Sequence, residues 1–271
     1  MTTDLDHAAI LADLVDLARR AGALTQRHFE NFRDIEIGIK GPADFVSAAD
    51  RESELLIREH LFARYPGWSF TGEEFDPVDH ADSAYRWLVD PIDGTTNFLN
   101  GMHYTISIAL RRGTETLLGI LYNPPADEMF TVIKGQGAFL NGQPLRVSQQ
   151  TAIATMCVGT GLPTPNLSLY PGAYARLDAI RAPIGAVRIV GSAANSCAYV
   201  AMGRLTGYYE ETGFTDTASS ILMVQEAGGI VTDWWGRGPE FYERTGCLLV
   251  ANPATHAYLL DHLKDVPPKD P

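Results

Sequence analysis

The chain carries, directly after the apolar run Trp87-Leu88-Val89, the sequence Asp90-Pro91-Ile92-Asp93-Gly94-Thr95-Thr96-Asn97-Phe98. The apolar run predicts a short buried strand, which delivers Asp90 and Asp93 to one end of a sheet. Two carboxylates this close repel each other unless they share a proton or bind a hard cation such as Mg²⁺. The Gly94-Thr95-Thr96 segment offers backbone N–H groups where a helix or tight turn begins, which suits a phosphate. The stretch therefore predicts phosphate chemistry.

Composition sets broad limits on the fold and on the partners. The chain has 271 residues, of which 45% are hydrophobic, so it can bury a sizeable core as one large domain or two fused halves. The net charge of −12 argues against nucleic acid or an anionic membrane as the main partner. An anionic small molecule stays possible as a substrate, because bound metal ions can invert the sign of a site.

The N-terminus and the cysteines predict a cytoplasmic protein. The first six residues are acidic and lack the basic start of a signal peptide, and every apolar stretch falls short of the roughly 18 residues of a membrane span. Cys157, Cys197 and Cys247 each lie in an apolar setting, which favours buried reduced thiols.

Hydrophobic periodicity predicts two N-terminal helices, then strands, then an alternating pattern. The first helices are expected over about 5–32 and 47–65, with a loop over 38–44 between them. The predicted strands are at residues 68–74 (running into a turn), 87–90, 105–111, 116–122, 128–134, 137–140, 152–159, 186–190, 207–210 and 248–250. The later helices are expected over 174–180, 191–202 and 216–227, with Asp216 as an N-cap, and up to 263. The pair Trp234-Trp235 is expected to pack against a neighbouring element or a dimer partner.

Four further carboxylates stand at turns or helix starts just after apolar segments: Asp50, Glu73, Glu210 and Asp216. With the Asp90–Phe98 stretch they complete a pattern that resembles the inositol monophosphatase family of Mg²⁺-dependent, lithium-sensitive phosphatases over nearly the whole chain. The landmarks, in the family's order, are Lys40 with Asp44-Phe45-Val46-Ser47-Ala48-Ala49-Asp50, Gly72-Glu73-Glu74, Asp90 to Phe98, Gly191-Ser192-Ala193-Ala194, Tyr208-Tyr209-Glu210, Asp216 and Glu226-Ala227-Gly228-Gly229.

The resemblance implies an α/β fold, α+β in its N-terminal part and α/β in its C-terminal part, layered as an αβαβα sandwich. It implies a single domain over residues 1–271. About 1–150 would carry most metal ligands, and about 151–265 would carry the substrate contacts. The tail at 266–271 is expected to fray. A homodimer is a further implication.

The resemblance also implies a site with two to three Mg²⁺ ions. Glu73, Asp90 and the main-chain carbonyl of Ile92 would hold the first ion. Asp90, Asp93 and Asp216 would hold the second, and a third, weaker ion would lean on Glu73. Two such ions can stabilise both the attacking and the leaving oxygen of an in-line displacement.

The remaining implied roles concern water and substrate. Asp50 and Thr95 would form a hydrogen-bonded pair that orients and deprotonates the attacking water, so the catalytic set is Asp50, Thr95 and Glu73. The implied phosphate and substrate contacts are Gly94, Thr95, Asp93, Gly191, Ser192, Ala193, Glu210 and, on the rim, Lys40.

The expected reaction is hydrolysis of a small phosphate monoester, with inositol 1-phosphate or a related sugar or cyclitol phosphate as the leading substrate and no phosphoenzyme. Histidinol phosphate, fructose 1,6-bisphosphate and 3′-phosphoadenosine 5′-phosphate are alternatives within the same chemistry. A catalytically weak regulatory binding protein is the alternative outside it. Asp90 as a covalent nucleophile is disfavoured, because the residues after it do not follow the Asp-x-Asp-x-Thr pattern.

The sequence departs from the family's pattern on the side that reads the substrate. Thr215 stands where the family usually has tryptophan, and the segment from Glu210 to Asp216 is one residue shorter. Either Glu210 or Glu211 could therefore face the substrate, and a second carboxylate there would suit an amine-bearing one. The loop Gly161–Asn166 differs as well. The departures leave the metal side intact and the substrate open.

Overall fold

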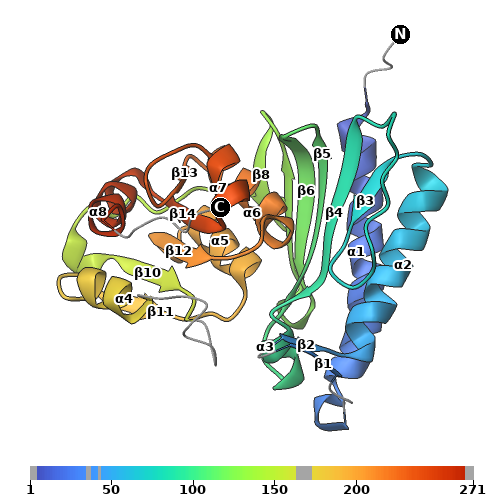
Figure 1. Ribbon diagram of the computed structural model, residues 1–271, viewed down its shortest axis with the longest axis horizontal. Helices are drawn as coiled ribbons and strands as arrows, with labels where there is room; N and C mark the ends of the chain where they lie inside the picture. Colours follow the sequence, from blue (N-terminus) through green and yellow to red (C-terminus); the bar gives the residue numbers. More distant parts are fainter. Residues whose placement is uncertain (1–4, 35–37, 42–43, 163–172, 266–271) are drawn as a thin grey trace.

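Two large β-sheets alternate with three layers of helices in the computed structural model, which describes residues 5–34, 38–41, 44–162 and 173–265 (Figure 1). Helices α1 (His7–Phe29) and α2 (Ala48–Arg64) cover the outer face of a seven-stranded sheet. Helices α5 (Ala193–Ala201) and α6 (Phe214–Glu226) fill the space between this sheet and a five-stranded one. Helices α4 (Ala173–Arg181) and α8 (Pro253–Leu263) lie outside the five-stranded sheet. The expected α/β fold and αβαβα layering are confirmed.

The seven-stranded sheet is built from consecutive strands. Its order is β3 (Ser69–Thr71), β4 (Tyr85–Asp93), β5 (Thr105–Arg112), β6 (Glu115–Asn123), β7 (Glu128–Ile133), β8 (Gly137–Leu140) and β9 (Gln143–Pro144). β3 and β4 are parallel, and the other neighbours are antiparallel. Most residues of β5 and β6 are buried, because helices cover both faces of the sheet.

Strand β4 contains a bulge at the point where its carboxylates lie. Asp90 is opposite Ser107 and Asp93 is opposite Thr105, so three steps along β4 match two along β5. One extra residue on β4 turns both carboxylates to the same face of the sheet, whereas three regular steps would turn them to opposite faces. Ser107 on that face hydrogen-bonds to Ser219 of α6 over 2.8 Å. The carboxylates therefore face the inner helices.

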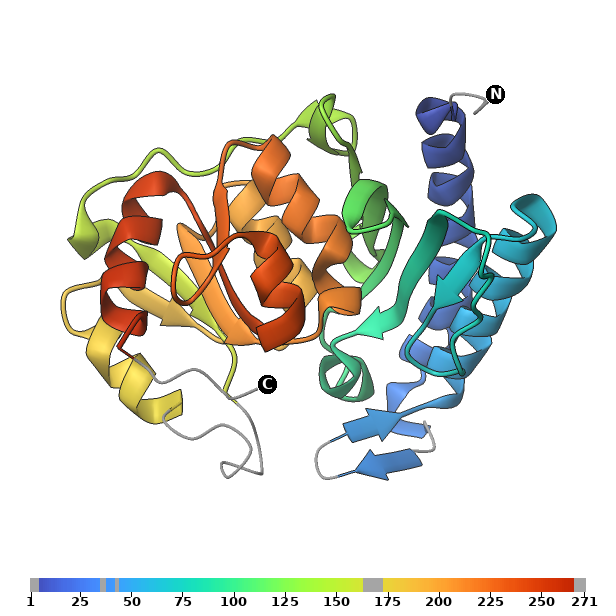
Figure 2. The same ribbon diagram turned by 45° about the horizontal axis from the view of Figure 1, so that its top comes forward.

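The inner helices are buried around most of their circumference because sheets flank them on both sides (Figure 2). Beyond them the five-stranded sheet has the order β11 (Ala186–Arg188), β10 (Cys157–Thr160), β12 (Gly207–Glu211), β14 (Cys247–Ala251) and β13 (Ile230–Asp233). The short helices are α3 (Thr95–Leu99) and α7 (Pro239–Thr245), with 3₁₀ turns η1 (Phe32–Asp34), η2 (Pro124–Ala126) and η3 (Ile153–Thr155). No helix among the described residues has the length and apolar character needed to span a bilayer.

Several sequence-based expectations need correction. The predicted loop over 38–44 contains an antiparallel pair, β1 (Gly38–Gly41) and β2 (Asp44–Val46). Asp216 is not an N-cap but the third residue of α6, which begins after Gly213. The strand expected over 152–159 begins only at Cys157, after η3. Strand β13 and helix α7 were not predicted at all.

The expected burial of the aromatic pair and of the thiols is confirmed in part. Trp234 is buried, and its indole N–H donates to the Leu248 carbonyl over 2.9 Å, so it packs against a neighbouring element. Cys197 and Cys247 are buried and reduced, whereas Cys157 is only half-buried. The tail at 266–271 lies outside the described residues.

Candidate active site

Four carboxylates from three separate segments approach one another where β4 ends. Asp90 and Asp93 come from the bulge of β4, Glu73 from the turn after β3, and Asp216 from the first turn of α6. Burial, followed by repulsion from the other three carboxylates, raises the pKa of Asp90 well above its ordinary value. The nearby Glu73 side chain contributes to this rise in pKa. The cluster is therefore strained when every member is ionised.

Asp216 belongs to the same cluster of charge. Burial is the largest cause that raises its pKa to about 7, and repulsion from Asp93 and Glu73 adds to it. A bound cation stabilises such a cluster of carboxylates, because it offsets both their mutual repulsion and the cost of burying their charge. Among the described residues, no three acidic, histidine or cysteine side chains already stand in metal-ligand geometry. The oxygen donors nevertheless suit Mg²⁺, which keeps several waters and needs only a few carboxylates.

Asp93 also joins the two halves of the chain. Its Oδ2 accepts hydrogen bonds from Ser192 Oγ, from Ala194 N at 2.9 Å and from Thr105 Oγ1 at 3.2 Å, while Oδ1 accepts from Ala193 N at 3.2 Å. The start of α5 thus partly neutralises this carboxylate. Burial still dominates and raises the pKa of Asp93.

The pair predicted to orient water lies at the starts of two helices. Thr95 Oγ1 donates to Asp50 Oδ1 at a long 3.4 Å and to the Ile92 carbonyl at 3.2 Å. The other oxygen of Asp50 accepts from Ser47 N at 2.8 Å and Ser47 Oγ at 2.6 Å, in a capping box that opens α2. The Ser-x-x-Asp spacing was the sequence signal for this second role, which the sequence analysis missed.

Two glycines bring the halves together beside these residues. Gly94, at the N-cap of α3, has a φ of 95°, and a Cβ there would lie 2.9 Å from the Gly191 carbonyl oxygen. Gly191 also has a positive φ, of 76°. The close approach and the left-handed backbone both require glycine. The close approach of the two glycines places Gly191, Ser192 and Ala193 against the N-terminus of α3, next to Asp93.

Glu210 and Glu211 point to opposite faces of β12, as successive residues of a strand must. Glu211 forms an ion pair with Arg176 at 3.3 Å, with only 5% of the arginine and 9% of the glutamate side chain exposed. Glu210 accepts a hydrogen bond from the Tyr208 hydroxyl, and burial raises its pKa to about 7. Glu211 is thus paired on one face of β12, while Glu210 lies on the side of Asp93 and stays the predicted substrate-facing acid.

The segment before Asp216 is held by residues that the sequence analysis overlooked. The buried Tyr242 hydroxyl lies 2.8 Å from Thr217 Oγ1, 2.7 Å from the Gly213 carbonyl and 3.2 Å from the Thr212 carbonyl. These contacts flank Asp216 on both sides. The Tyr242 hydroxyl therefore anchors this segment, in which Thr215 stands at the expected tryptophan position. No motif in the sequence pointed to Tyr242.

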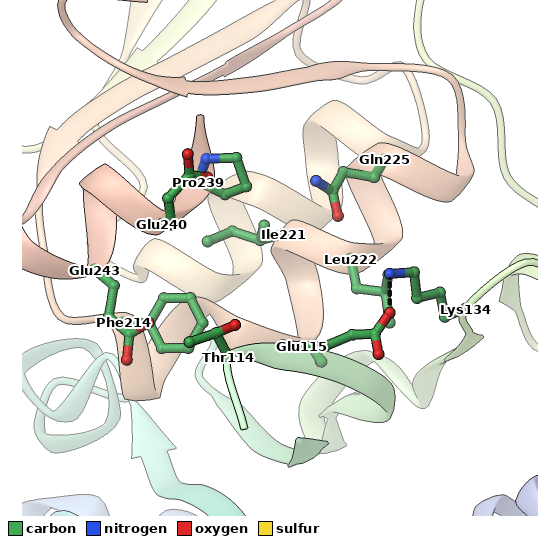
Figure 3. Close-up of a pocket in the computed structure, with 11 residues that line it drawn as sticks. Thr114, Glu115, Lys134, Phe214, Ile221, Leu222, Gln225, Pro239, Glu240 and Glu243 are labelled. Carbon is green, nitrogen blue, oxygen red and sulfur yellow. Dashed lines mark hydrogen bonds and ion pairs between the residues drawn. The ribbon is translucent and has the colours of Figure 1, made fainter. Parts of the chain in front are cut away.

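A second anchor lies beside this segment. Arg111 of β5 makes a bidentate pair with Glu243 of α7 at 2.6 and 3.0 Å and stacks over the Phe214 ring. Phe214 and Glu243 also line a cavity of about 250 Å³ along α6 (Figure 3). Three carboxylates line this cavity, and its one lysine, Lys134, pairs with Glu115. An anionic phosphate would be repelled there, so the cavity is unsuited to the substrate.

Lys40 is a residue of β1, and its side chain lies outside the described part of the chain. The loop Gly161–Asn166 is described only up to Leu162. A Cβ on Gly161 would lie 1.7 Å from Glu210 Oε1, so this glycine leaves room for the carboxylate.

Comparison with known proteins places these observations in a family. Residues 6–267 match the model of the inositol monophosphatase family. An inositol-1-monophosphatase of Rhizobium meliloti is 40% identical over 86% of this chain and 88% of its own. The Nus factor SuhB of Escherichia coli K12 is 35% identical over 93% and 94%. The crystal structure of the extragenic suppressor protein suhB from Bartonella henselae superposes with a TM-score of 0.89 at 36% identity, covering 96% of this chain and all of that one. The chain therefore belongs to the inositol monophosphatase family.

Proposed function

We propose that this protein hydrolyses a small phosphate monoester with Mg²⁺ bound by Glu73, Asp90, Asp93, Asp216 and the carbonyl of Ile92. The observation that supports this most is the convergence of four mutually repelling carboxylates, two of them raised in pKa chiefly by burial on the same bulge. Clustered carboxylate oxygens of this kind fit a divalent metal ion.

The chain's own residues would divide the work of the reaction. Bound Mg²⁺ would supply an activated water and stabilise charge on the phosphoryl oxygens. Asp50 would accept the proton of the attacking water, and the Thr95 hydroxyl beside it would fix that water's direction. The backbone N–H groups of Gly94 and Thr95 would bind the phosphate at the start of α3. No covalent phosphoenzyme is part of the proposal.

For the alcohol portion we propose inositol 1-phosphate or a related sugar or cyclitol phosphate. Glu210 would accept hydrogen bonds from the ring hydroxyls, next to Gly191, Ser192 and Ala193. The name of the Rhizobium relative supports this choice. An amine-bearing substrate such as histidinol phosphate loses its main argument, because the Glu211 carboxylate is paired with Arg176 on the other face of β12.

The test is phosphate release from a panel of monoesters with and without Mg²⁺. The panel contains inositol 1-phosphate, histidinol phosphate, fructose 1,6-bisphosphate and 3′-phosphoadenosine 5′-phosphate. We expect Mg²⁺-dependent, Li⁺-inhibited turnover that Asp93→Asn abolishes and that Asp178→Asn, on the exposed side of α4, leaves unchanged. Absence of Mg²⁺-dependent turnover on every ester would sink the enzyme assignment.

A regulatory role is the second candidate, favoured by the relatives that carry the name Nus factor SuhB. This role would replace the enzymatic one if the chain binds Mg²⁺ but hydrolyses none of the esters.

We also propose that the protein forms a homodimer. Met102 and Ile189, 48% and 56% exposed, line one groove of the surface. Light scattering at micromolar concentration would test it. We keep the cytoplasmic location as a prediction.

A further inference from the structure

Helix α2 carries a second acid one turn after Asp50. Glu54 is fully buried, and its carboxylate accepts hydrogen bonds from three consecutive backbone N–H groups of the turn after β3. Oε2 accepts from Glu73 N at 2.9 Å and from Glu74 N at 2.7 Å, and Oε1 accepts from Phe75 N at 3.2 Å. Neither the sequence pattern nor the resemblance assigned Glu54 a role.

Close packing against the turn after β3 restricts the position of the Glu54 carboxylate. A Cβ on Gly72 would lie 2.1 Å from Glu54 Oε1, so the turn approaches the acid as closely as a glycine allows. The turn's three N–H groups all point at one side chain, which therefore sets the direction in which the Glu73 side chain leaves the backbone. Because Asp50 and Glu54 are four residues apart, one face of α2 holds both the proposed water-orienting acid and this contact.

We propose that Glu54 is a positioning residue that holds Glu73 in place for metal binding and ties that ligand to the helix that carries Asp50. The role rests on the proposed function, since it requires that Glu73 bind Mg²⁺. Glu54 itself would not touch the ion. Its loss would let the turn relax and move Glu73 away from Asp90, which weakens metal binding more than it weakens the chemistry at saturating metal.

The experiment measures Mg²⁺ binding without substrate, by titration calorimetry on the full chain, for Glu54→Gln and for Glu59→Gln. Glu59 lies on the same helix and is exposed, so it controls for the loss of one charge on α2. We expect the Mg²⁺ dissociation constant to rise about 10–100-fold in Glu54→Gln, the usual effect of removing a group that orients a metal ligand. Glu59→Gln should match the parent. At saturating Mg²⁺, kcat of Glu54→Gln should return to within a few-fold of the parent.

The outcomes separate this role from a merely structural one. A Glu54→Gln protein with a lower melting temperature and the parent's Mg²⁺ dissociation constant would overturn the proposal. Should that variant not fold, Gly72→Ala decides, because its methyl group displaces the carboxylate and leaves the charge in place. A folded Gly72→Ala protein with unchanged Mg²⁺ affinity would also overturn it. A parent chain that binds no Mg²⁺ contradicts the proposed function itself.

Discussion

At the scale of single residues, Asp90 shows how the site opposes the fold. It is 2% exposed and faces three other carboxylates, so its ionised form destabilises the metal-free protein. Such acids are retained where they bind something, and stability rises when they are removed. Asp90 Oδ1 also accepts a hydrogen bond from Ile92 N at 3.0 Å, which an asparagine oxygen can keep.

Asp90→Asn should therefore stabilise the metal-free protein and abolish activity. At pH 8 the melting temperature should rise by roughly 2–4 °C for each kcal/mol of repulsion relieved. The measurements are thermal unfolding in a chelator and Mg²⁺-dependent phosphate release. A variant that is both less stable without metal and still active would contradict the place of Asp90 at the centre of the cluster.

Single residues were also the scale at which the sequence was least informative. Glu210 and Glu211 are chemically identical, and only the register of β12 against β14 decides which face each takes. That register depends on contacts far away in the chain, so no local pattern could give it. The roles of Asp90 and Asp93 were easier to predict, because their short spacing alone implies electrostatic repulsion that a proton or a cation must relieve.

At the scale of elements, the loop between β12 and α6 determines where Asp216 lies. The Tyr242 hydroxyl from α7 bonds on both sides of that residue. Removing one buried hydrogen-bonding hydroxyl costs about 1–3 kcal/mol. Here the loss should also loosen the first turn of α6.

Tyr242→Phe should lower both the melting temperature and the affinity for Mg²⁺. Tyr258→Phe is the matched control. The Tyr258 hydroxyl makes one 2.8 Å hydrogen bond to the Ile180 carbonyl, in the helix layer outside the five-stranded sheet. The control variant should have a lower melting temperature but the parent's affinity for Mg²⁺. The anchoring role would be wrong if the two variants responded to Mg²⁺ alike in a thermal-shift titration.

Elements with strong periodicity could be predicted from the sequence, and short ones could not. Helix α1 and the β7–β8 hairpin follow from apolar spacing, and the Asn141-Gly142 turn signal falls between β8 and β9. The β1–β2 pair is made of a glycine-rich segment that reads locally as a loop, and α7 spans only Pro239–Thr245. These short elements form because the rest of the fold holds them, and their own residues carry too weak a preference.

At the scale of the whole molecule, the acidic cluster should couple stability to pH and metal. Burial and repulsion raise the carboxyl pKa values in the folded state, for Asp216 and Glu210 to about 7. The folded protein then holds protons that the unfolded chain has released. These groups therefore stabilise it below about pH 4 and lose that effect as pH rises through about 7.

The melting temperature of the metal-free protein should accordingly fall between pH 5.5 and pH 8, and Mg²⁺ should raise it more at pH 8. Thermal scans at both pH values, with NaCl matching the ionic strength, would measure this. Equal Mg²⁺ effects at the two pH values would contradict the account. We also propose that the two halves form one domain, which predicts a single unfolding transition in the same scans.

The bulge in β4 sets a rule for how relatives of this chain can change length. Deleting one residue between Asp90 and Asp93 would remove the bulge. Inserting one on β5 opposite it, between Thr105 and Ser107, would restore regular alternation over three steps and send one carboxylate into the apolar layer beneath α1 and α2. The loop after β12 lies outside any strand pairing, so its length is not fixed by the register of a sheet. Insertions and deletions should therefore accumulate around Thr212 over evolutionary time, while the Asp90–Asp93 interval stays invariant even in relatives that have changed substrate.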